Sequence, residues 1–185
     1  MRRPAGAAEH DSQRQDMFDT VLGLPIHPLV VHAVVVLVPL AAIGIIVVAL
    51  NPMLRDRYGL LVFGVATASL VAVPVATKSG EALLARLFTS TVPSGVVQHR
   101  LIGQDVIWFV LAMWAAMGAL LLLDRDRERR RGVGSPVLPT IVAVVAVLAA
   151  LIASGQVLRA GWTGVETRWS GVVALPDEPA VTPNG

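Results

Sequence analysis

Residues 29–50 read LVVHAVVVLVPLAAIGIIVVAL, an unbroken apolar run without Lys, Arg, Asp or Glu. A helix needs about 20 residues to cross a hydrocarbon core about 30 Å thick, so this run is long enough to span a membrane. Three further apolar segments follow, at about residues 59–77, 104–123 and 137–158, and the third span is free of these charged residues from Val106 onward. They lack the alternation of apolar and polar residues that barrel strands show. The sequence therefore predicts an all-α fold, an integral membrane four-helix bundle.

The composition of the whole chain agrees with this prediction. Of its 185 residues, 55% are hydrophobic and 15% are charged, and the mean hydropathy is +0.68. Cysteine is absent, which excludes disulfides, thiolate metal sites and thiol catalysis. The formal net charge is +2, but the arginines cluster beside the spans, so we expect no nucleic-acid partner. Without a Walker loop, dinucleotide fingerprint or nucleophile elbow, we expect no independent enzymatic activity.

The arginines also predict an orientation in the cell membrane. Two short loops, residues 51–58 and 124–135, hold seven of them at high density. Basic residues concentrate in cytoplasmic loops. We therefore expect a multi-pass protein with these two loops in the cytoplasm and both termini outside.

Outside the spans, the chain divides into two tails around one membrane domain. We assign residues 1–26 to a polar N-terminal tail, residues 27–173 to the membrane domain and residues 174–185 to a C-terminal tail. The Pro-rich, polar C-terminal tail predicts disorder. The first sixteen residues have no apolar core of a signal peptide, and Met17 opens MFDTVLGLPIHP, so we expect translation to begin at Met17.

The segment between the second and third spans is a candidate cover for the outer face. Leu83, Leu84, Leu87 and Phe88 lie on one stripe of a helix drawn through this segment. The stripe predicts an amphipathic outer loop that lies along the membrane interface. The alternative is a partly buried connector without function.

Three of the four histidines stand where apolar segments begin: His27, His32 and His99. Ionisable residues are costly at such places and are candidates for function. Pro28 suits the first position of a helix and Ser94 suits an N-cap. His32 and His99 then each lie near the fifth position of their helices, at similar depth on the same outer side. His27 becomes a boundary residue.

This placement predicts a b-type haem, or another metal, bound between His32 and His99, with His27 as the alternative ligand. Histidines on facing helices are a known way to build cofactor sites in bundles. The candidate partners of haem propionates are Lys78, Arg100 and Arg159. The other polar residues at this outer face are Asp105, Glu81, Glu166 and Trp162.

Two other classes of function stay open. One is a non-catalytic membrane scaffold or partner-binding subunit, in which the histidines only donate hydrogen bonds between helices. The other is proton-linked transport of a small molecule, with Asp105 and His99 as a relay. These two residues are about 120° apart on an ideal helix, so they share no face. Besides the lipid bilayer, the partners considered are a redox or other membrane protein and a second copy of the chain.

Three stretches of the chain resemble one bacterial family: MFDTVLGLPIHPLVVHAVVVLVPLAA from Met17, QHRLIGQD from Gln98, and GWTGVETRWSGVV ending at Val173. They are similar to the bacterial, especially actinobacterial, membrane proteins grouped as domain of unknown function 2231. The HPxxVH element at residues 27–32 is the most specific part. The resemblance implies four membrane helices and no established activity. Some relatives are joined to Rieske-type iron–sulfur domains, which implies a link to electron transfer, but this chain has no cysteines for such a cluster. Relatives often carry His or Asp where this chain has Trp162, which removes one ligand here.

Overall fold

The computed structural model describes residues 20–21, 24–88, 91–129, 135 and 137–173. Within these ranges the chain forms four helices and one short antiparallel strand pair, in the order β1 (Thr20–Val21), β2 (Leu24–Pro25), α2 (Ile26–Leu50), α3 (Pro52–Leu87), α4 (Ser94–Arg129) and α5 (Val137–Val173). All four helices are long and apolar enough to cross a membrane. The prediction of an all-α four-helix membrane bundle is confirmed. The N-terminal residues up to 19, with Met17, and the C-terminal tail from 174 lie outside the described residues.

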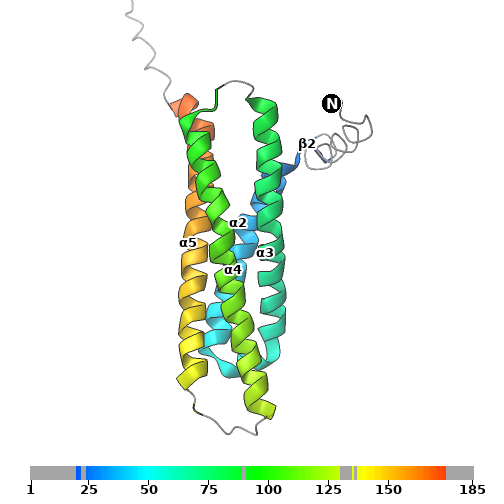
Figure 1. The fold of residues 1–185 in the computed structure, drawn as a ribbon, viewed down its shortest axis with the longest axis vertical. Coiled ribbons are helices and arrows are strands. Elements are labelled where there is room, and N and C mark those ends of the chain that lie inside the picture. The colour runs from blue at the N-terminus through cyan, green and yellow to red at the C-terminus, as the bar shows by residue number, and fades with distance from the viewer. Residues whose placement is uncertain (1–19, 22–23, 89–90, 130–134, 136, 174–185) are drawn as a thin grey trace, which may run out of the picture.

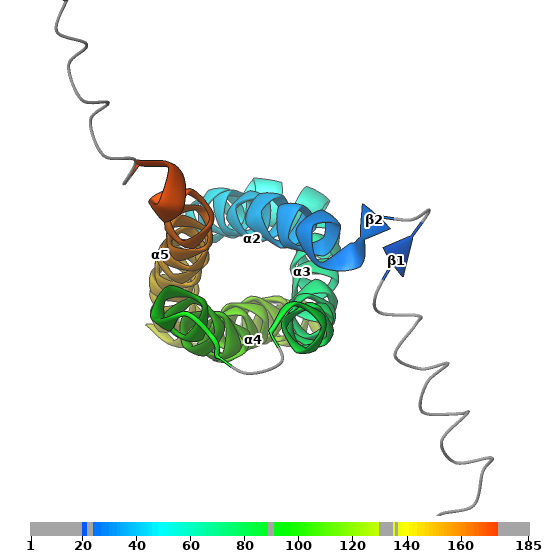
Figure 2. The same cartoon turned by 90° about the horizontal axis from the view of Figure 1, so that it is seen from above.

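The helices run alternately up and down and stand side by side (Figure 1). Seen from above, they form a ring in the order α2, α3, α4, α5, with α5 beside α2 (Figure 2). Val38, Ile45, Met113 and Met117 are fully buried on the axis of this ring. The outer surface carries large apolar side chains such as Trp108, which is 67% exposed. A surface of this kind suits a lipid bilayer, in contrast to the small apolar patches of soluble proteins.

Three of the helices are longer than the apolar spans that the sequence predicts. Helices α3, α4 and α5 have 36, 36 and 37 residues, so each is about 54–56 Å long at 1.5 Å per residue. They therefore extend beyond a hydrocarbon core about 30 Å thick. The segment with the leucine stripe forms the last turns of α3 and is not a separate interfacial loop, because the helix continues without a break to Leu87.

One end of the bundle is closed by a buried ion pair. The Arg55 side chain of α3 pairs with Asp124 near the end of α4, and its Nη2 donates to Oδ1 over 3.1 Å. The same guanidinium donates to the carbonyls of Val48 and Ala49, both at 3.3 Å. These carbonyls belong to the last turn of α2, where the helix itself offers them no N–H partner. Arg55 therefore holds the ends of α2, α3 and α4 together.

The bundle consists of two similar hairpins, α2–α3 and α4–α5. Buried residues of α2 recur in α4 at a constant offset of 72 residues: Val34 and Val106, Val38 and Val110, Ile45 and Met117. Buried residues of α3 recur in α5 at an offset of 84 residues: Ala66 and Ala150, Ser69 and Ala153, Val73 and Val157. The two hairpins are thus related by a pseudo-twofold axis along the bundle, as in parallel-repeat membrane proteins.

Candidate histidine site

His27 is the second residue of α2 and points toward α3. Its Nδ1 lies 3.0 Å from the carbonyl oxygen of Ala76 and 3.2 Å from Oγ of Ser79. A carbonyl oxygen only accepts a hydrogen bond, so Nδ1 carries the proton and Nε2 keeps its lone pair. The Ser79 hydroxyl is buried and itself donates to the Ala76 carbonyl over 3.0 Å. The His27 ring is thereby fixed by two groups on the neighbouring helix.

His99, on α4, repeats this arrangement against α5. Its Nδ1 lies 3.0 Å from the carbonyl oxygen of Ala160 and 3.3 Å from Oγ1 of Thr163. Thr163 in turn donates to the Ala160 carbonyl over 2.9 Å. By the same reasoning, the His99 ring is protonated on Nδ1 and its Nε2 is an acceptor.

The two anchored rings meet near the bundle axis. The ring centroids of His27 and His99 are 6.4 Å apart, and the ring planes are inclined at 76°. The side chains are half-buried. In the described part of the chain, neither Nε2 atom has a hydrogen-bond partner. The site therefore offers two imidazole lone pairs on half-buried side chains.

A glycine makes room for each ring. A Cβ placed on Gly80 would lie 2.8 Å from Cε1 of His27, and a Cβ on Gly164 would lie 3.1 Å from Cε1 of His99. The first distance is shorter than real Cβ contacts allow, and the second is tight. Each ring thus packs closely against the backbone of the neighbouring helix, and at Gly80 a Cβ would force the ring or the backbone to move.

The structure places His27 next to His99. His27 is the residue that the sequence predicted only as the alternative ligand. His32 lies on the outside of α2, is exposed, and has its Nδ1 within 2.5 Å of the Pro28 carbonyl of its own helix. The reason is the phase of α2: His27 is seven residues before the buried Val34 and lies within about 20° of it, whereas His32 is two residues before it and lies about 160° away. Helix α2 also begins at Ile26, two residues before Pro28, the residue expected to open it. The first turn therefore includes His27, whereas His32, five residues further on, points about 140° away from it.

The charged and aromatic residues predicted for this face are not brought to the histidine pair. Lys78 pairs with Glu81 over 3.1 Å at the surface, and its side chain is 69% exposed. The remaining members of the set are exposed on the outsides of α4 and α5: Arg100, Asp105, Arg159, Trp162 and Glu166. Asp105 and His99 thus do not share a face of α4, as the helix geometry predicts.

The residues that hold the rings were not assigned a role from the sequence. They are Ser79 and Gly80 on α3, and Thr163 and Gly164 on α5. A signal was present, because ATKSG at residues 76–80 and AGWTG at residues 160–164 share the pattern Ala-x-x-Ser/Thr-Gly near the ends of the second and fourth spans. Comparing the two halves of the chain would have found it.

The site offers two candidate ligand residues, His27 and His99. Among the described residues, no group of three or more His, Cys, Asp or Glu side chains could hold a metal ion. The arrangement can therefore bind through two imidazole nitrogens, or serve only as a polar contact between helices.

The fold and this site together define the class: a four-helix membrane protein with a histidine pair anchored near one end of the bundle. The chain belongs to the family described as predicted membrane protein DUF2231, which matches residues 23–176 and so includes all four helices and both histidine anchors. The family resemblance is confirmed. Neither the curated proteins nor the solved structures contain a significant match to the chain.

Proposed function

We propose that the protein is a membrane redox subunit that binds a b-type haem between His27 and His99. The observation that carries the proposal is the pair of Nδ1-anchored rings, each with an unpartnered Nε2. Metal-ligating histidines commonly donate their other ring N–H to a backbone carbonyl, which fixes the ring and raises its basicity. Ala76 and Ala160 supply such carbonyls.

The distance between the rings favours ligands on opposite sides of one metal. With metal–nitrogen bonds of about 2.0–2.1 Å and about 1.1 Å from nitrogen to ring centre, two trans imidazoles have centroids about 6.3 Å apart. Two imidazoles in a tetrahedral site would bring the centroids to about 5 Å. The observed 6.4 Å is close to the trans value and also lies in the range of ordinary edge-to-face ring contacts, so it supports a trans arrangement over a tetrahedral one only if a metal is bound between the two Nε2 atoms.

The number of protein ligands favours haem over a bare ion. A bare ion with two histidines would lack ligands in the described part of the chain, whereas the macrocycle of a haem supplies its own four nitrogens. When bound, haem iron supplies one-electron transfer at a potential tuned by its axial ligands. The chain fixes the two axial nitrogens, and the buried valines two turns further along, Val34 and Val106, keep the setting apolar.

We further propose that the histidine end faces the outside of the cell membrane and the arginine-rich loops face the cytoplasm. The density of arginines in residues 51–58 and 124–135 supports this orientation. A redox partner would then meet the bundle at its outer end, where the loop between α3 and α4 also lies (Figure 1).

The test is a reduced-minus-oxidised visible spectrum of protein purified in mild detergent after haem-supplemented expression. We expect a Soret and an α band in the wild type, and loss of both in His27→Ala and in His99→Ala. His32→Ala is the matched control, because it removes the same ring from the exposed side of the same helix, and it should keep the bands.

Three results would overturn the proposal. A wild-type protein without bands and without bound metal would leave the pair as a contact between helices. Bands that persist in both His27→Ala and His99→Ala would place the haem elsewhere. Metal without bands would replace haem by a two-coordinate ion such as monovalent copper.

A further inference from the structure

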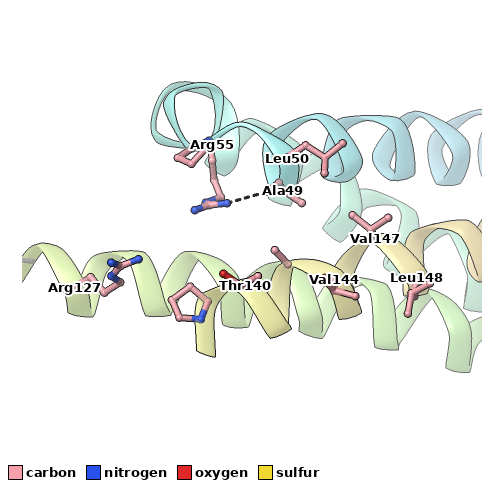
Figure 3. A pocket seen from close by; sticks show the side chains of 11 residues that line it. Ala49, Leu50, Arg55, Arg127, Thr140, Val144, Val147 and Leu148 are labelled. Carbon is pink, nitrogen blue, oxygen red and sulfur yellow. Dashed lines mark hydrogen bonds between the residues drawn. The ribbon is translucent and has the colours of Figure 1, made fainter. Parts of the chain in front are cut away.

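A groove lies between α2 and α5 at the arginine-rich end of the bundle, opposite the end that holds the histidine pair. Its volume is about 410 Å³. Figure 3 shows Ala49 and Leu50 on one wall and Val144, Val147 and Leu148 on the other. The groove is thus an apolar channel on the side of a membrane helix bundle.

The pseudo-twofold axis relates this groove to the space between α4 and α3, where larger side chains stand at two equivalent positions. The residues equivalent to Ala49 and Val147 are Leu121 and Phe63. Leu121 lies against Gly59, and Phe63 stacks on Trp114 with ring centroids 5.3 Å apart. At these two positions the groove therefore has smaller side chains than its counterpart, which leaves more room between α2 and α5.

Arginines stand at the end of the groove that meets the membrane surface. Arg55 is occupied by Asp124 and by the carbonyls of α2. Arg127, on α4, also lines the groove, and Figure 3 shows its guanidinium on the groove side of the helix. An apolar channel that ends in a cation matches an acyl chain that ends in a phosphate. Basic pockets between membrane helices bind anionic lipid headgroups in this way.

We propose that this groove binds one anionic phospholipid of the adjacent leaflet. One acyl chain lies between α2 and α5 against Val144, Val147 and Leu148, and the phosphodiester meets Arg127. The asymmetry between the two halves of the bundle makes this a single site. It is independent of the histidine pair and of any haem.

The test compares lipid retention by the full-length protein in native mass spectrometry. Protein in detergent is exposed to equal amounts of phosphatidylglycerol and phosphatidylcholine. We expect the wild type to retain at least five-fold more phosphatidylglycerol. Arg127→Gln should remove this preference, and Val147→Phe, which copies Phe63 of the other half, should reduce retention of both lipids.

Arg129→Gln is the matched control, since it removes the same charge from an exposed position on α4 one half-turn away. It should keep the preference. Excess inorganic phosphate should not displace the lipid, because the acyl chain contributes to binding. Equal retention of the two lipids, an equal loss in Arg129→Gln, or displacement by phosphate would each overturn the proposal. If Val147→Phe does not fold, Arg127→Gln against Arg129→Gln still decides.

Discussion

At the scale of single residues, the two glycines beside the histidines are the strictest requirement of the site. In Gly80→Ala the new Cβ would lie 2.8 Å from Cε1 of His27, so the ring or the α3 backbone must move. Overpacking of this kind typically costs about 1–3 kcal/mol. We expect a lower melting temperature and, if haem binds, a weakened α band, measured by thermal unfolding and visible spectroscopy.

Gly155→Ala is the control for helix propensity, because a Cβ there meets nothing within 4 Å. It should leave the α band unchanged and raise the melting temperature slightly, because alanine is about 0.5–1 kcal/mol more favourable than glycine inside a helix. Gly164→Ala should lie between the two, since its closest contact is 3.1 Å. Equal effects at Gly80 and Gly155 would contradict the close approach of His27 to α3.

The same residues explain how far the site was predictable. The end of the bundle that holds the histidine pair, and the place of His99 in it, follow from the sequence, because they depend only on where apolar spans begin. The choice between His27 and His32 depends on the rotational phase of α2, because only one of two residues five positions apart can lie on the face of the buried Val34 and Val38. Ser79 and Thr163 could not be chosen from composition, since their role lies in contacts between helices.

At the scale of the elements, the junction of α2, α3 and α4 depends on the Arg55–Asp124 pair. The side chains are 9% and 19% exposed, respectively. Asp124→Asn would leave a buried guanidinium without its counter-charge. Breaking a buried pair costs about 3–5 kcal/mol, and the residual exposure of Asp124 favours the lower end. Unfolding in denaturing detergent would measure this loss.

Two further variants test whether the loss of stability in Asp124→Asn comes from the unpaired buried charge. Arg55→Met combined with Asp124→Leu should recover part of the stability, because no charge is then left unpaired. Recovery should be incomplete, since the carbonyls of Val48 and Ala49 lose their donor. Lys78→Gln removes an exposed pair and should change stability by no more than about 1 kcal/mol. A loss in Lys78→Gln as large as in Asp124→Asn would refute the special role of the buried pair.

The helices themselves were predicted from apolar length, and their ends were predicted less well. Pro93 and Ser94 mark the start of α4, which begins at Ser94. The end of α3 was missed because Lys78, Ser79 and Gly80 interrupt the apolar run while the backbone continues as a helix to Leu87. Hydropathy detects the part of a helix that lies in lipid, whereas the part of α3 beyond its apolar run contacts His27 of α2 through Ser79 and Gly80.

At the scale of the whole molecule, the pseudo-twofold relation separates what the two halves share from what distinguishes them. The shared features are the buried register and the anchored histidines, one from each hairpin. The halves differ at two equivalent positions: Phe63 stacks on Trp114, whereas Val147 lines the groove. A symmetric site on the axis and an asymmetric groove at the opposite end therefore have separate structural origins. Substitutions in the histidine pair should therefore leave lipid binding in the groove unchanged, and substitutions in the groove should leave haem binding at the histidine pair unchanged.

The orientation of the bundle can be tested with single cysteines, because the chain has none of its own. Gln98→Cys lies one residue before His99, and Asp56→Cys lies beside the buried Arg55; both positions are exposed. In right-side-out membrane vesicles, a membrane-impermeant maleimide should label Gln98→Cys directly and Asp56→Cys only after permeabilisation. Helices α2 and α4 run in the same direction (Figure 1), and the rings of His27 and His99 lie side by side. The Gln98 label therefore locates both histidines at once. The reverse pattern of labelling would place the histidine pair at the cytoplasmic end and contradict the orientation inferred from the arginines.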